Sequence, residues 1–448
     1  MKQSGGRGRS TRSVAICRRG ACGRSDFSRL WTAARQGVHA SSYLADATGA
    51  PVQVDRPGIF NRLLALPMKC GPVWLAIALV ATHPAWSQEN SGLIFAPLVS
   101  GHALPGTQPD NHASTVVELR NGDVLVAWFG GTAEGDPDVA IYGARQHNGR
   151  WNTPRELARA THVACWNPVL FHDGKGVLWL YYKVGKSPST WTGMRKSSTD
   201  EGVSWSATEP LPPGILGPIK DKPLLLADGT IVSGSSVESN KWTAWIERSA
   251  DGGHTWTKFG PITIPEALDL PNAGALAAEG ERRHADHDAS TKVNTKFNPP
   301  DKATVGLIQP SVVSLGDHHL RFFARSKTKA QRIAVADSFD EGLTWTTAHY
   351  INLPNPNSGI DAVGLRDGRV VLAFNNSYNR RSPLDLAVSR GGEKFTIFRE
   401  LDKGPGQYSY PAIVQAANGD LLITYSWRRQ SIKFVRIPLS GVPSPKER

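Results

Sequence analysis

The sequence predicts an all-β protein that folds as a six-bladed β-propeller, and two internal repeats carry this prediction. The first repeat is an eight-residue pattern, Ser-x-Asp-x-Gly-x-Thr/Ser-Trp, which begins at Ser198, Ser249 and Ser338. The second is a short apolar run followed by a Gly-containing turn, and the turn glycines are Gly122, Gly174, Gly229, Gly316, Gly368 and Gly419. Asn-Gly and Asp-Gly turns between apolar runs are strong hairpin signals, so both repeats indicate short antiparallel strands.

The spacing of the turn glycines sets the number of repeated units. Successive glycines are 52, 55, 87, 52 and 51 residues apart, so five steps join six units. Four-stranded propeller blades have a period of roughly fifty residues. The long step predicts an insertion at about 264–303, which we expect to form a surface loop or lid.

Each residue of the eight-residue pattern has a local role that we expect the fold to use. A Ser and an Asp two positions apart can hydrogen-bond to the backbone of a tight turn. The Gly can adopt the positive φ that such a turn requires, and the Trp can anchor the turn to the sheet beneath it. Weaker copies occur at Asn148–Trp151 and Ser389–Phe395. Near the C-terminus, Ile432–Arg436 is expected to supply a strand that closes the ring.

Residues 1–67 do not resemble part of a folded domain. They contain 11 Lys or Arg and three acidic residues, which accounts for +8 of the formal net charge of +12. Because the excess charge is concentrated in this segment, the basic composition does not predict nucleic-acid binding. We interpret the segment as an extension upstream of a true start at Met68, and we expect its Cys17 and Cys22 to be unpaired thiols.

Residues 68–87 resemble a secretory signal peptide. A basic residue after the methionine precedes the apolar run Val73–Ala81, and Ala85–Ser87 resembles a cleavage site. An apolar run of about ten residues is too short to span a bilayer comfortably; a buried strand or a membrane anchor is the alternative. We therefore expect residues 88–448 to form a periplasmic or secreted monomer without a membrane span, in which Cys165 has no disulfide partner.

Polar residues stand near the start of the innermost strand in every unit. Seven residues before the turn glycine lie Asn167, Lys222, Gln309 and Asp361, and slightly earlier in the other two units lie His112 and Tyr410. The innermost strands of a propeller surround its central channel, so these six side chains are expected to form a polar ring. We interpret the ring as a functional site, because buried polar groups are costly to leave unpaired. The alternative is a hydrated channel without function.

Arginines lie beside the expected ring. Arg325 ends a strand of the fourth unit, Arg381 precedes a strand of the fifth, and Arg428 and Arg429 follow Trp427 in the sixth. If several of these guanidinium groups point at the ring, they would bind a carboxylate through a bidentate fork.

An acidic loop follows the second strand of the first unit and contains Glu134, Asp136 and Asp138. One of these side chains could act as a general acid if partial burial raised its pKa. A solvated acidic turn is the alternative for each of them. The sequence predicts neither a metal ion nor a cofactor.

Taken together, the repeats and these residues resemble the sialidase (neuraminidase) superfamily, with its bacterial neuraminidase-repeat members, over about residues 100–438. The resemblance implies three arginines that hold the substrate carboxylate, a Tyr nucleophile activated by an acidic partner, and an Asp that acts as acid and base. A Tyr nucleophile is an exception to the usual two-carboxylate scheme of glycoside hydrolysis.

Several residues match what the resemblance implies. Arg325 and Arg381 resemble two of the three arginines. Tyr408, in Gln-Tyr-Ser-Tyr-Pro, resembles the nucleophile's Tyr-Ser motif, whereas the spacing of the repeats favours Tyr410.

The acid/base loop and two other positions complete the comparison. Asp136 or Asp138 falls where the acid/base loop belongs. The first unit opens with Asn111–Ser114 in place of an arginine motif, and Gln309 stands nearest to the expected glutamate. A neutral glutamine cannot activate a phenol as a base.

Three functions remain open on this reading, and all three have an acidic oligosaccharide or polysaccharide as the partner. The first is a sialidase-like exo-glycosidase that acts on an acidic sugar such as a sialic or uronic acid. The second is a polysaccharide lyase or rhamnosidase-like enzyme that acts on rhamnose–glucuronate linkages, in which His112 or Tyr410 would transfer the proton. The third is a glycan-binding propeller without catalysis.

Overall fold

The computed structural model describes residues 99–104, 108–239, 241–265 and 306–445. The chain separates into two units, Met1–Ser87 and Gln88–Arg448, and the described residues all belong to the second unit. The expected extension and signal peptide therefore lie outside the described residues. The same holds for the expected insertion, apart from residues 264 and 265.

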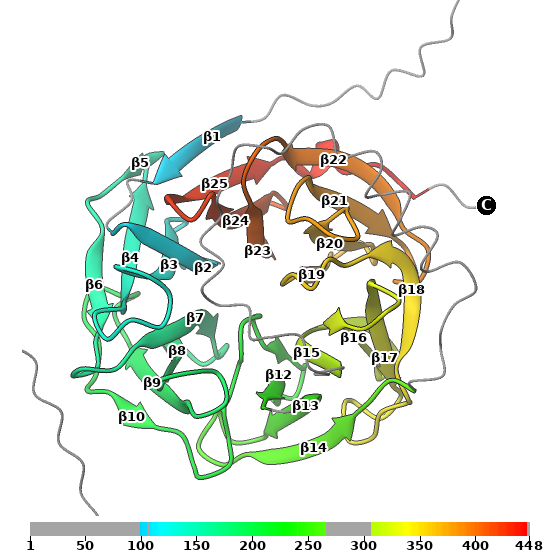
Figure 1. The fold of residues 1–448 in the computed structure, drawn as a ribbon, viewed down its shortest axis with the longest axis horizontal. Helices are drawn as coiled ribbons and strands as arrows, with labels where there is room; N and C mark the ends of the chain where they lie inside the picture. The colour runs from blue at the N-terminus through cyan, green and yellow to red at the C-terminus, as the bar shows by residue number, and fades with distance from the viewer. Residues whose placement is uncertain (1–98, 105–107, 240, 266–305, 446–448) are drawn as a thin grey trace, which may run out of the picture. The chain divides into compact units, whose positions relative to one another are not determined.

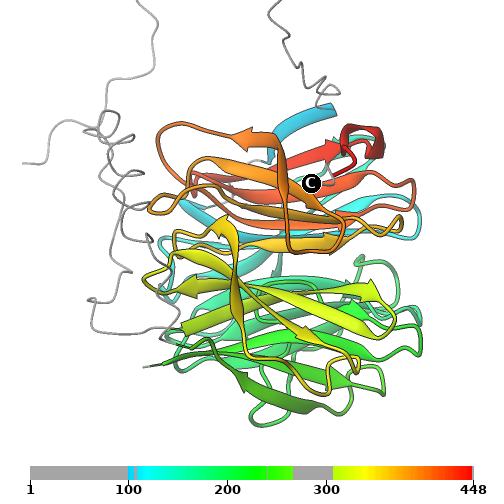
Figure 2. The same ribbon diagram turned by 90° about the vertical axis from the view of Figure 1, so that its right-hand side faces the viewer.

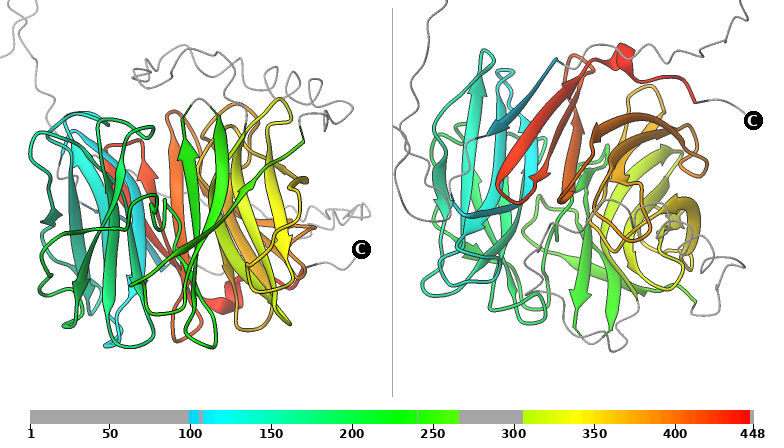
Figure 3. Two further views of the ribbon diagram at one scale, coloured as in Figure 1. Left: turned by 90° about the horizontal axis from the view of Figure 1, so that it is seen from below. Right: turned by 45° about the horizontal axis from the view of Figure 1, so that its top comes forward.

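The regular secondary structure of the described residues is almost entirely β, which confirms the all-β prediction. A 3-10 helix, η2 (Leu439–Gly441), follows the last strand. None of the helical structure in the described ranges is long and apolar enough to cross a membrane. The sheets are arranged around a common centre, with β2, β7, β15, β19 and β23 on the side that faces it (Figure 1). Seen from the side, the strands run between two faces of this arrangement, and the turns gather on those faces (Figures 2 and 3).

Three of the sheets contain strands that are consecutive in the sequence and antiparallel to their neighbours. The first sheet contains β2 (Asp110–Glu118), β3 (Val124–Gly131), β4 (Ala140–His147), β5 (Arg150–Trp151) and β6 (Arg155–Ala158). The second contains β7 (Cys165–His172), β8 (Leu178–Val184), β9 (Thr192–Ser198) and β10 (Glu209–Pro210). A later sheet contains β19 (Asp361–Gly364), β20 (Val370–Asn375), β21 (Leu384–Ser389) and β22 (Thr396–Asp402).

An eight-stranded sheet lies between them and consists of two antiparallel groups. The first group contains β11 (Leu224–Leu225), β12 (Ile231–Glu238), β13 (Trp242–Ser249) and β14 (Thr257–Ile262). The second contains β15 (Gly306–Gly316), β16 (His319–Lys327), β17 (Arg332–Ser338) and β18 (His349–Pro354). A parallel pairing of Trp242 with Gly306 joins the two groups, so the hydrogen bonding merges two repeats that the sequence keeps apart.

The final sheet contains the first and the last strands of the described chain. Its order is β1 (Val99–Leu104), β25 (Ser431–Ile437), β24 (Leu421–Trp427) and β23 (Tyr408–Gln415). The strand expected near the C-terminus corresponds to β25, and β1 pairs with it from Val99 opposite Arg436 to Leu104 opposite Ile432. The first strand of the described chain thus completes the sheet formed by the last three.

The repeated eight-residue turns are built as the sequence predicts. In the turn at Ser249, the Ser hydroxyl donates to Asp251 at 2.8 Å and accepts from the Gly253 amide at 2.7 Å. Asp251 also accepts from the Thr255 amide, and the Trp256 indole donates to the Gly253 carbonyl at 2.9 Å. Gly253 has a φ of 90°, the left-handed conformation that a glycine adopts without a steric penalty. The turns at Ser198 and Ser338 repeat the Ser-to-Asp bond at 2.7 Å.

Apolar side chains fill the spaces between neighbouring sheets. Phe129 and Ile141 of the first sheet pack with Leu170 and Leu180 of the second in one buried cluster. Tyr410 of the final sheet reaches the same cluster. The cores between sheets therefore fix the inner strands relative to one another, which sets the geometry of the polar groups at their starts.

Candidate active site

The inner strands of four sheets carry the same irregularity. In each of them the pairing register breaks near the start of the strand, and a residue other than glycine adopts a positive φ: Ala113 (52°) in β2, Asn167 (40°) in β7, Gln309 (55°) in β15 and Tyr410 (53°) in β23. β-Bulges re-aim side chains, and such strained backbone tends to cluster at functional sites. Three of these four residues belong to the polar ring that the sequence predicts.

Tyr410 lies where two arginines converge. Nη1 of Arg325 donates to the Tyr410 Oη at 2.7 Å, and the guanidinium carbons of Arg325 and Arg381 lie 5.8 and 5.5 Å from the centre of its ring. Asn357 holds both arginines, because its side-chain oxygen accepts from Arg325 Nε at 2.8 Å and its carbonyl accepts from Arg381 at 3.3 Å. The two guanidinium groups are therefore positioned together on one aromatic ring.

These two arginines lack a carboxylate partner within the described residues. Arg325 is 7% exposed, and Arg381 is partly exposed. Burial, followed by the positive charge of Arg325, lowers the pKa of Arg381 to about 10. Two neighbouring guanidinium groups that share no anion repel each other, so an anion bound between them would be stabilised by both.

His112 packs against the same tyrosine. Its ring centre lies 4.3 Å from that of Tyr410 and 5.6 Å from that of Phe129, whose ring is nearly perpendicular to the imidazole. Burial lowers the pKa of His112 well below its usual value, and the positive charges of Arg429 and Arg381 lower it further. The imidazole is therefore neutral at physiological pH. Its buried Nδ1 has no hydrogen-bond partner in the described part of the chain.

Gln309 connects the arginines to a carboxyl group. Its side-chain oxygen accepts from Arg325 at 3.4 Å, and its amide nitrogen donates to Glu238 Oε1 at 3.4 Å. Ser236 also donates to this oxygen, at 3.3 Å. Glu238 ends β12 and pairs across the sheet with Trp242, whose ring lies 5.2 Å from the Arg325 guanidinium. No acidic partner for Tyr410 could be predicted from the sequence. In the structure, Glu238 is connected to Tyr410 through two side chains, Gln309 and Arg325.

Arg429, rather than Arg428, faces the centre from the final sheet. Arg429 donates to Asp110 at 2.8 and 2.9 Å and to Glu134 at 2.7 Å. These carboxylates raise the pKa of Arg429 despite its burial. Arg428 is exposed and lies over Trp427, with its guanidinium carbon 4.7 Å from the ring. Arg429 therefore lies at the centre, where Arg428 was expected.

Lys222 and Asp361 lie at the centre but are used to hold the sheets together. The Lys222 ammonium donates to both oxygens of Asp361, at 2.9 and 3.0 Å, and to the Ala362 carbonyl at 2.7 Å. Asp361 also accepts from the Ser311 hydroxyl at 2.7 Å and from the Ile413 amide at 2.8 Å. All three donors of the ammonium group are occupied, so the expectation that Lys222 and Asp361 bind substrate does not fit this geometry.

Lys220 and Asn167 have comparable structural roles. Lys220 donates to Asp221 at 2.6 Å and to the carbonyls of Ile360 and Pro411 at 2.7 and 2.6 Å. Asn167 donates to the Ile219 carbonyl at 3.1 Å and is 4% exposed. These bonds connect the segment that precedes β11 to the sheets that contain β7, β19 and β23. We expect them to make the centre rigid.

Three of the expected catalytic residues lie apart from the cluster. Tyr408 is 1% exposed in the apolar core between the last two sheets, where its hydroxyl donates to the Pro405 carbonyl at 3.2 Å. Asp138 is exposed and accepts from the amide and hydroxyl of Thr132 within its own loop. Asp136 makes no side-chain hydrogen bond or ion pair within the described residues. The member of this loop that reaches the centre is Glu134.

Sequence reasoning missed Lys220, Asn357 and Glu238. Lys220 lies two residues before Lys222, so it does not have the seven-residue spacing from the turn glycine that marks the other members of the predicted ring. Asn357 lies in the loop before β19, and no pattern marks that loop. Glu238 ends the second strand of its unit, whereas the polar ring predicted from the repeats comes from the first strand of each unit. It comes near Arg325 because β12, β13, β15 and β16 are successive neighbours in one sheet.

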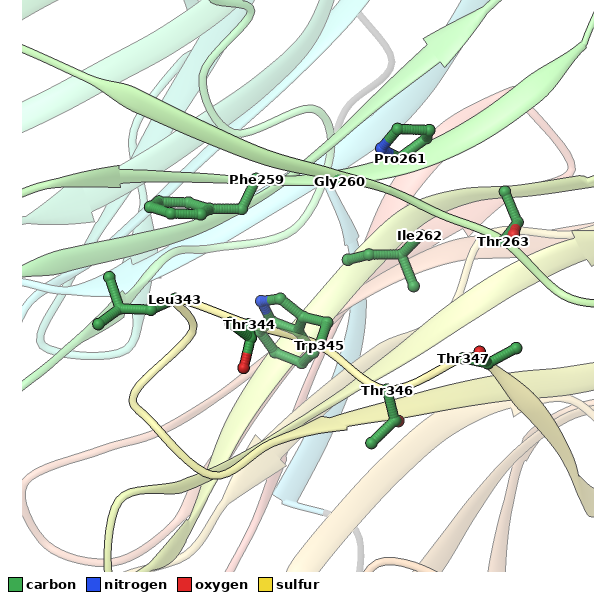
Figure 4. Close-up of a pocket in the computed structure, with 10 residues that line it drawn as sticks. All are labelled: Phe259, Gly260, Pro261, Ile262, Thr263, Leu343, Thr344, Trp345, Thr346 and Thr347. Atoms are coloured by element: carbon green, nitrogen blue, oxygen red, sulfur yellow. The ribbon is translucent and has the colours of Figure 1, made fainter.

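A pocket on another part of the molecule differs in chemistry from this cluster. It lies between β14 and the eight-residue turn before β18, where Trp345 and Ile262 contribute to its wall (Figure 4). Its lining residues carry no ionisable side chain. The pocket offers no group for acid–base chemistry, so the cluster around Tyr410 is the candidate active site.

Solved structures with similar folds include sialidases. A protein of unknown function from Dyadobacter fermentans is 16% identical, with a TM-score of 0.59 over 76% of this chain and 98% of that chain. The NanB sialidase of Streptococcus pneumoniae is 15% identical, with a TM-score of 0.56 over 78% and 71%. An intramolecular trans-sialidase from Ruminococcus gnavus is 13% identical, with a TM-score of 0.54 over 77% and 98%. At these identities the likeness defines a propeller-type all-β fold.

The family follows from the sequence itself. Residues 122–423 match the model of the BNR repeat-like domain, which is more than half of the chain. The protein therefore belongs to the BNR repeat-like family. The resemblance expected from the repeated turns is confirmed. Among curated proteins, none matches this sequence.

Proposed function

We propose that the protein is an enzyme that cleaves a glycosidic bond next to an acidic sugar. The observation that carries this proposal is the pair of guanidinium groups, Arg325 and Arg381, which converge on Tyr410 and have no carboxylate partner among the described residues. Arginine binds carboxylates in a fork geometry with two parallel hydrogen bonds. A sugar carboxylate between the two arginines would relieve their repulsion and would place the adjacent carbon beside the Tyr410 hydroxyl.

The reaction that we favour is exo-hydrolysis of the sialidase type. Tyr410 is the proposed nucleophile at the anomeric carbon, and the arginines orient the sugar. The sialidase from S. pneumoniae and the trans-sialidase from R. gnavus share the fold, which makes a sialic acid the first sugar to test and a uronic acid the second. Gln309 is the nearest match to the glutamate that the sialidase resemblance implies, so we infer that the proton chemistry of this site differs from that scheme.

A lyase is the second candidate, and one observation favours it. His112 is neutral, it touches Tyr410, and its Nδ1 is unpartnered within the described residues. A neutral imidazole can abstract the proton α to a uronate carboxylate, while arginines neutralise the charge that develops on that carboxylate. The linkage to test is rhamnose–glucuronate. The third candidate, a propeller that only binds acidic glycans, would use the same arginines.

We also propose a molecular setting for this enzyme. The two antiparallel groups of the eight-stranded sheet count as two blades, which together with the other four sheets makes six. Removal of a signal peptide at residues 68–87 would release a periplasmic or secreted monomer. N-terminal sequencing of the native protein tests this, because a mature chain that begins before Met68 would contradict it.

The products of the wild-type protein distinguish the candidate functions. Sialosides and rhamnose–glucuronate oligosaccharides are incubated with the enzyme, and both ultraviolet absorbance and new reducing ends are followed. New reducing ends without absorbance from an unsaturated uronate support the hydrolase, and such absorbance supports the lyase. Tight binding without either product supports the glycan-binding propeller. A protein that neither binds nor cleaves any acidic glycan contradicts the whole proposal.

Replacing Arg381 with lysine tests the carboxylate site. Lysine keeps the charge but loses the fork, so we expect KM for an acidic substrate to rise about 10- to 100-fold, the equivalent of one charged hydrogen bond. The same variant should bind the carboxamide analogue of the substrate about as well as the wild type does. Arg428→Lys is the matched control, because Arg428 lies over Trp427, and it should leave KM unchanged. An unchanged KM in Arg381→Lys would remove this residue from the site.

A further inference from the structure

Glu238 occupies a distinctive position in the candidate active site. It ends β12, and its Oε1 accepts hydrogen bonds from Gln309 and Ser236 at 3.4 and 3.3 Å. No described residue donates to its other carboxyl oxygen. The side chain is partly exposed, so a substrate can reach it. Through Gln309 and Arg325 it is connected to the Tyr410 hydroxyl.

The other carboxyl groups of this cluster are held by cations. Asp110 and Glu134 pair with Arg429, Asp361 pairs with Lys222, and Asp221 pairs with Lys220. Asp361 and Asp221 are in addition only 1% and 2% exposed. Within the described residues, Glu238 makes no ion pair. Among the described carboxyl groups of the site, Glu238 is therefore the one that a substrate can reach and that is not paired with a cation.

The electrostatic surroundings favour a proton on Glu238. Burial raises the pKa of Glu238 to about 6, and the charge of Glu134 on the loop after β3 adds to this. Arg325 on β16 lowers the pKa, as do the hydrogen bonds from Ser236 and Gln309, but burial outweighs them. The carboxyl group is protonated below about pH 6 and ionised above it. General acids in glycosidases require such a raised pKa.

We propose that Glu238 is the proton donor of this enzyme and delivers its proton to the departing glycosidic oxygen. The inference rests on the proposed function. As the glycosidic C–O bond breaks, the O–H bond of the carboxyl group breaks and its proton passes to the leaving oxygen. Tyr410 releases its phenolic proton to solvent as its oxygen bonds to the anomeric carbon. When water displaces that oxygen, the Glu238 carboxylate takes one proton from the water and the phenolate recovers a proton from solvent, which restores the starting form. Water is the only co-reactant. The acid thus comes from β12 rather than from the loop that contains Asp136 and Asp138.

A leaving-group comparison tests this role. Glu238→Gln removes the proton but keeps the shape and the contact with Gln309. The two substrates are an oligosaccharide with a terminal acidic sugar and the 4-nitrophenyl glycoside of the same sugar. Nitrophenolate leaves without a proton, so the variant should lose about 10²- to 10⁴-fold in kcat/KM on the oligosaccharide and less than about 10-fold on the nitrophenyl glycoside. Asp138→Asn is the control and should match the wild type on both.

The pH profile gives a second measurement. Wild-type kcat/KM on the oligosaccharide should fall as the pH rises above about 6, because the donor loses its proton. This decline should be absent from the residual activity of Glu238→Gln, and it can be measured in the wild type without any substitution. Thermal unfolding should show that the variant folds as the wild type does.

The possible results separate this inference from the proposed function. Equal losses on both substrates with an unchanged pH profile would overturn the role of Glu238 while leaving the glycosidase intact. If Asp138→Asn lost much more activity on the oligosaccharide than on the nitrophenyl glycoside, Asp138 would be the proton donor instead of Glu238. A wild-type protein that cleaves neither substrate would overturn the proposed function, and the inference with it.

Discussion

Replacing Tyr410 with phenylalanine is expected to reduce kcat/KM on an acidic glycoside by at least about 10³-fold, as removal of a nucleophile does in other enzymes. The substitution deletes one oxygen, which accepts a 2.7 Å hydrogen bond from Arg325. The ring should keep its contact with His112 and its place in the core shared by the first two sheets. The loss should therefore appear in the chemical step, with little change in the free energy of unfolding.

Tyr408→Phe is the matched control for this experiment. Tyr408 lies two residues away on the same strand, and its hydroxyl donates to the Pro405 carbonyl at the edge of an apolar core. Removing that hydroxyl should cost about 1 kcal/mol of stability and leave kcat/KM near that of the wild type. Steady-state kinetics and urea unfolding of both variants check the pair. If the Tyr408 variant were inactive and the Tyr410 variant active, the Tyr-Ser motif would be the better guide, and the proposed site would be wrong.

The two tyrosines show which part of the candidate site could be predicted from the sequence and which part could not. Repeat spacing favoured Tyr410, and motif resemblance favoured Tyr408. Residues two apart on a regular strand point to the same side. Here the bulge between Ser409 and Ala412 breaks that rule, because Tyr410 adopts a φ of 53° and turns toward Arg325. Tyrosine rarely adopts a left-handed backbone conformation, so the sequence does not predict it here, and only the structure distinguishes the two residues.

The same limit applies to the charged residues. The repeated turns depend on local contacts within eight residues, which explains why the Ser–Asp–Gly–Trp geometry could be predicted residue by residue. The choice of Arg429 over Arg428 depends on contacts with Asp110, which is 319 positions away in the sequence. Glu238 becomes relevant only when neighbouring strands pair. Local patterns therefore predict the fold, whereas contacts between sheets decide which charged group reaches the centre.

A large loss of stability is expected from Asp361→Ala. Asp361 is 1% exposed and accepts from Lys222, Ser311, Ala362 and Ile413, so its removal leaves an ammonium group and several donors without their acceptor. Breaking a buried ion pair by removing one partner typically costs about 3–5 kcal/mol, because the other charge remains buried. Urea unfolding followed by intrinsic fluorescence measures the difference. Glu156→Ala removes the exposed Glu156–Arg159 pair, and this control should cost less than about 1 kcal/mol.

The double variant shows whether Lys222 and Asp361 act as a structural pair. Lys222→Met combined with Asp361→Ala removes the stranded charge, so the double variant should be about 1–3 kcal/mol more stable than Asp361→Ala alone. Lys222→Met by itself should keep KM for an acidic substrate within about threefold of the wild type, because all three of its donors are already occupied within the protein. A KM that rises about 100-fold in Lys222→Met, without a loss of stability, would support the substrate-binding role that was predicted for Lys222 from the repeats. The centre of the ring would then bind the substrate carboxylate itself. In the arrangement described here, the centre serves as the fixed support that holds Arg325, Arg381 and Tyr410 in place.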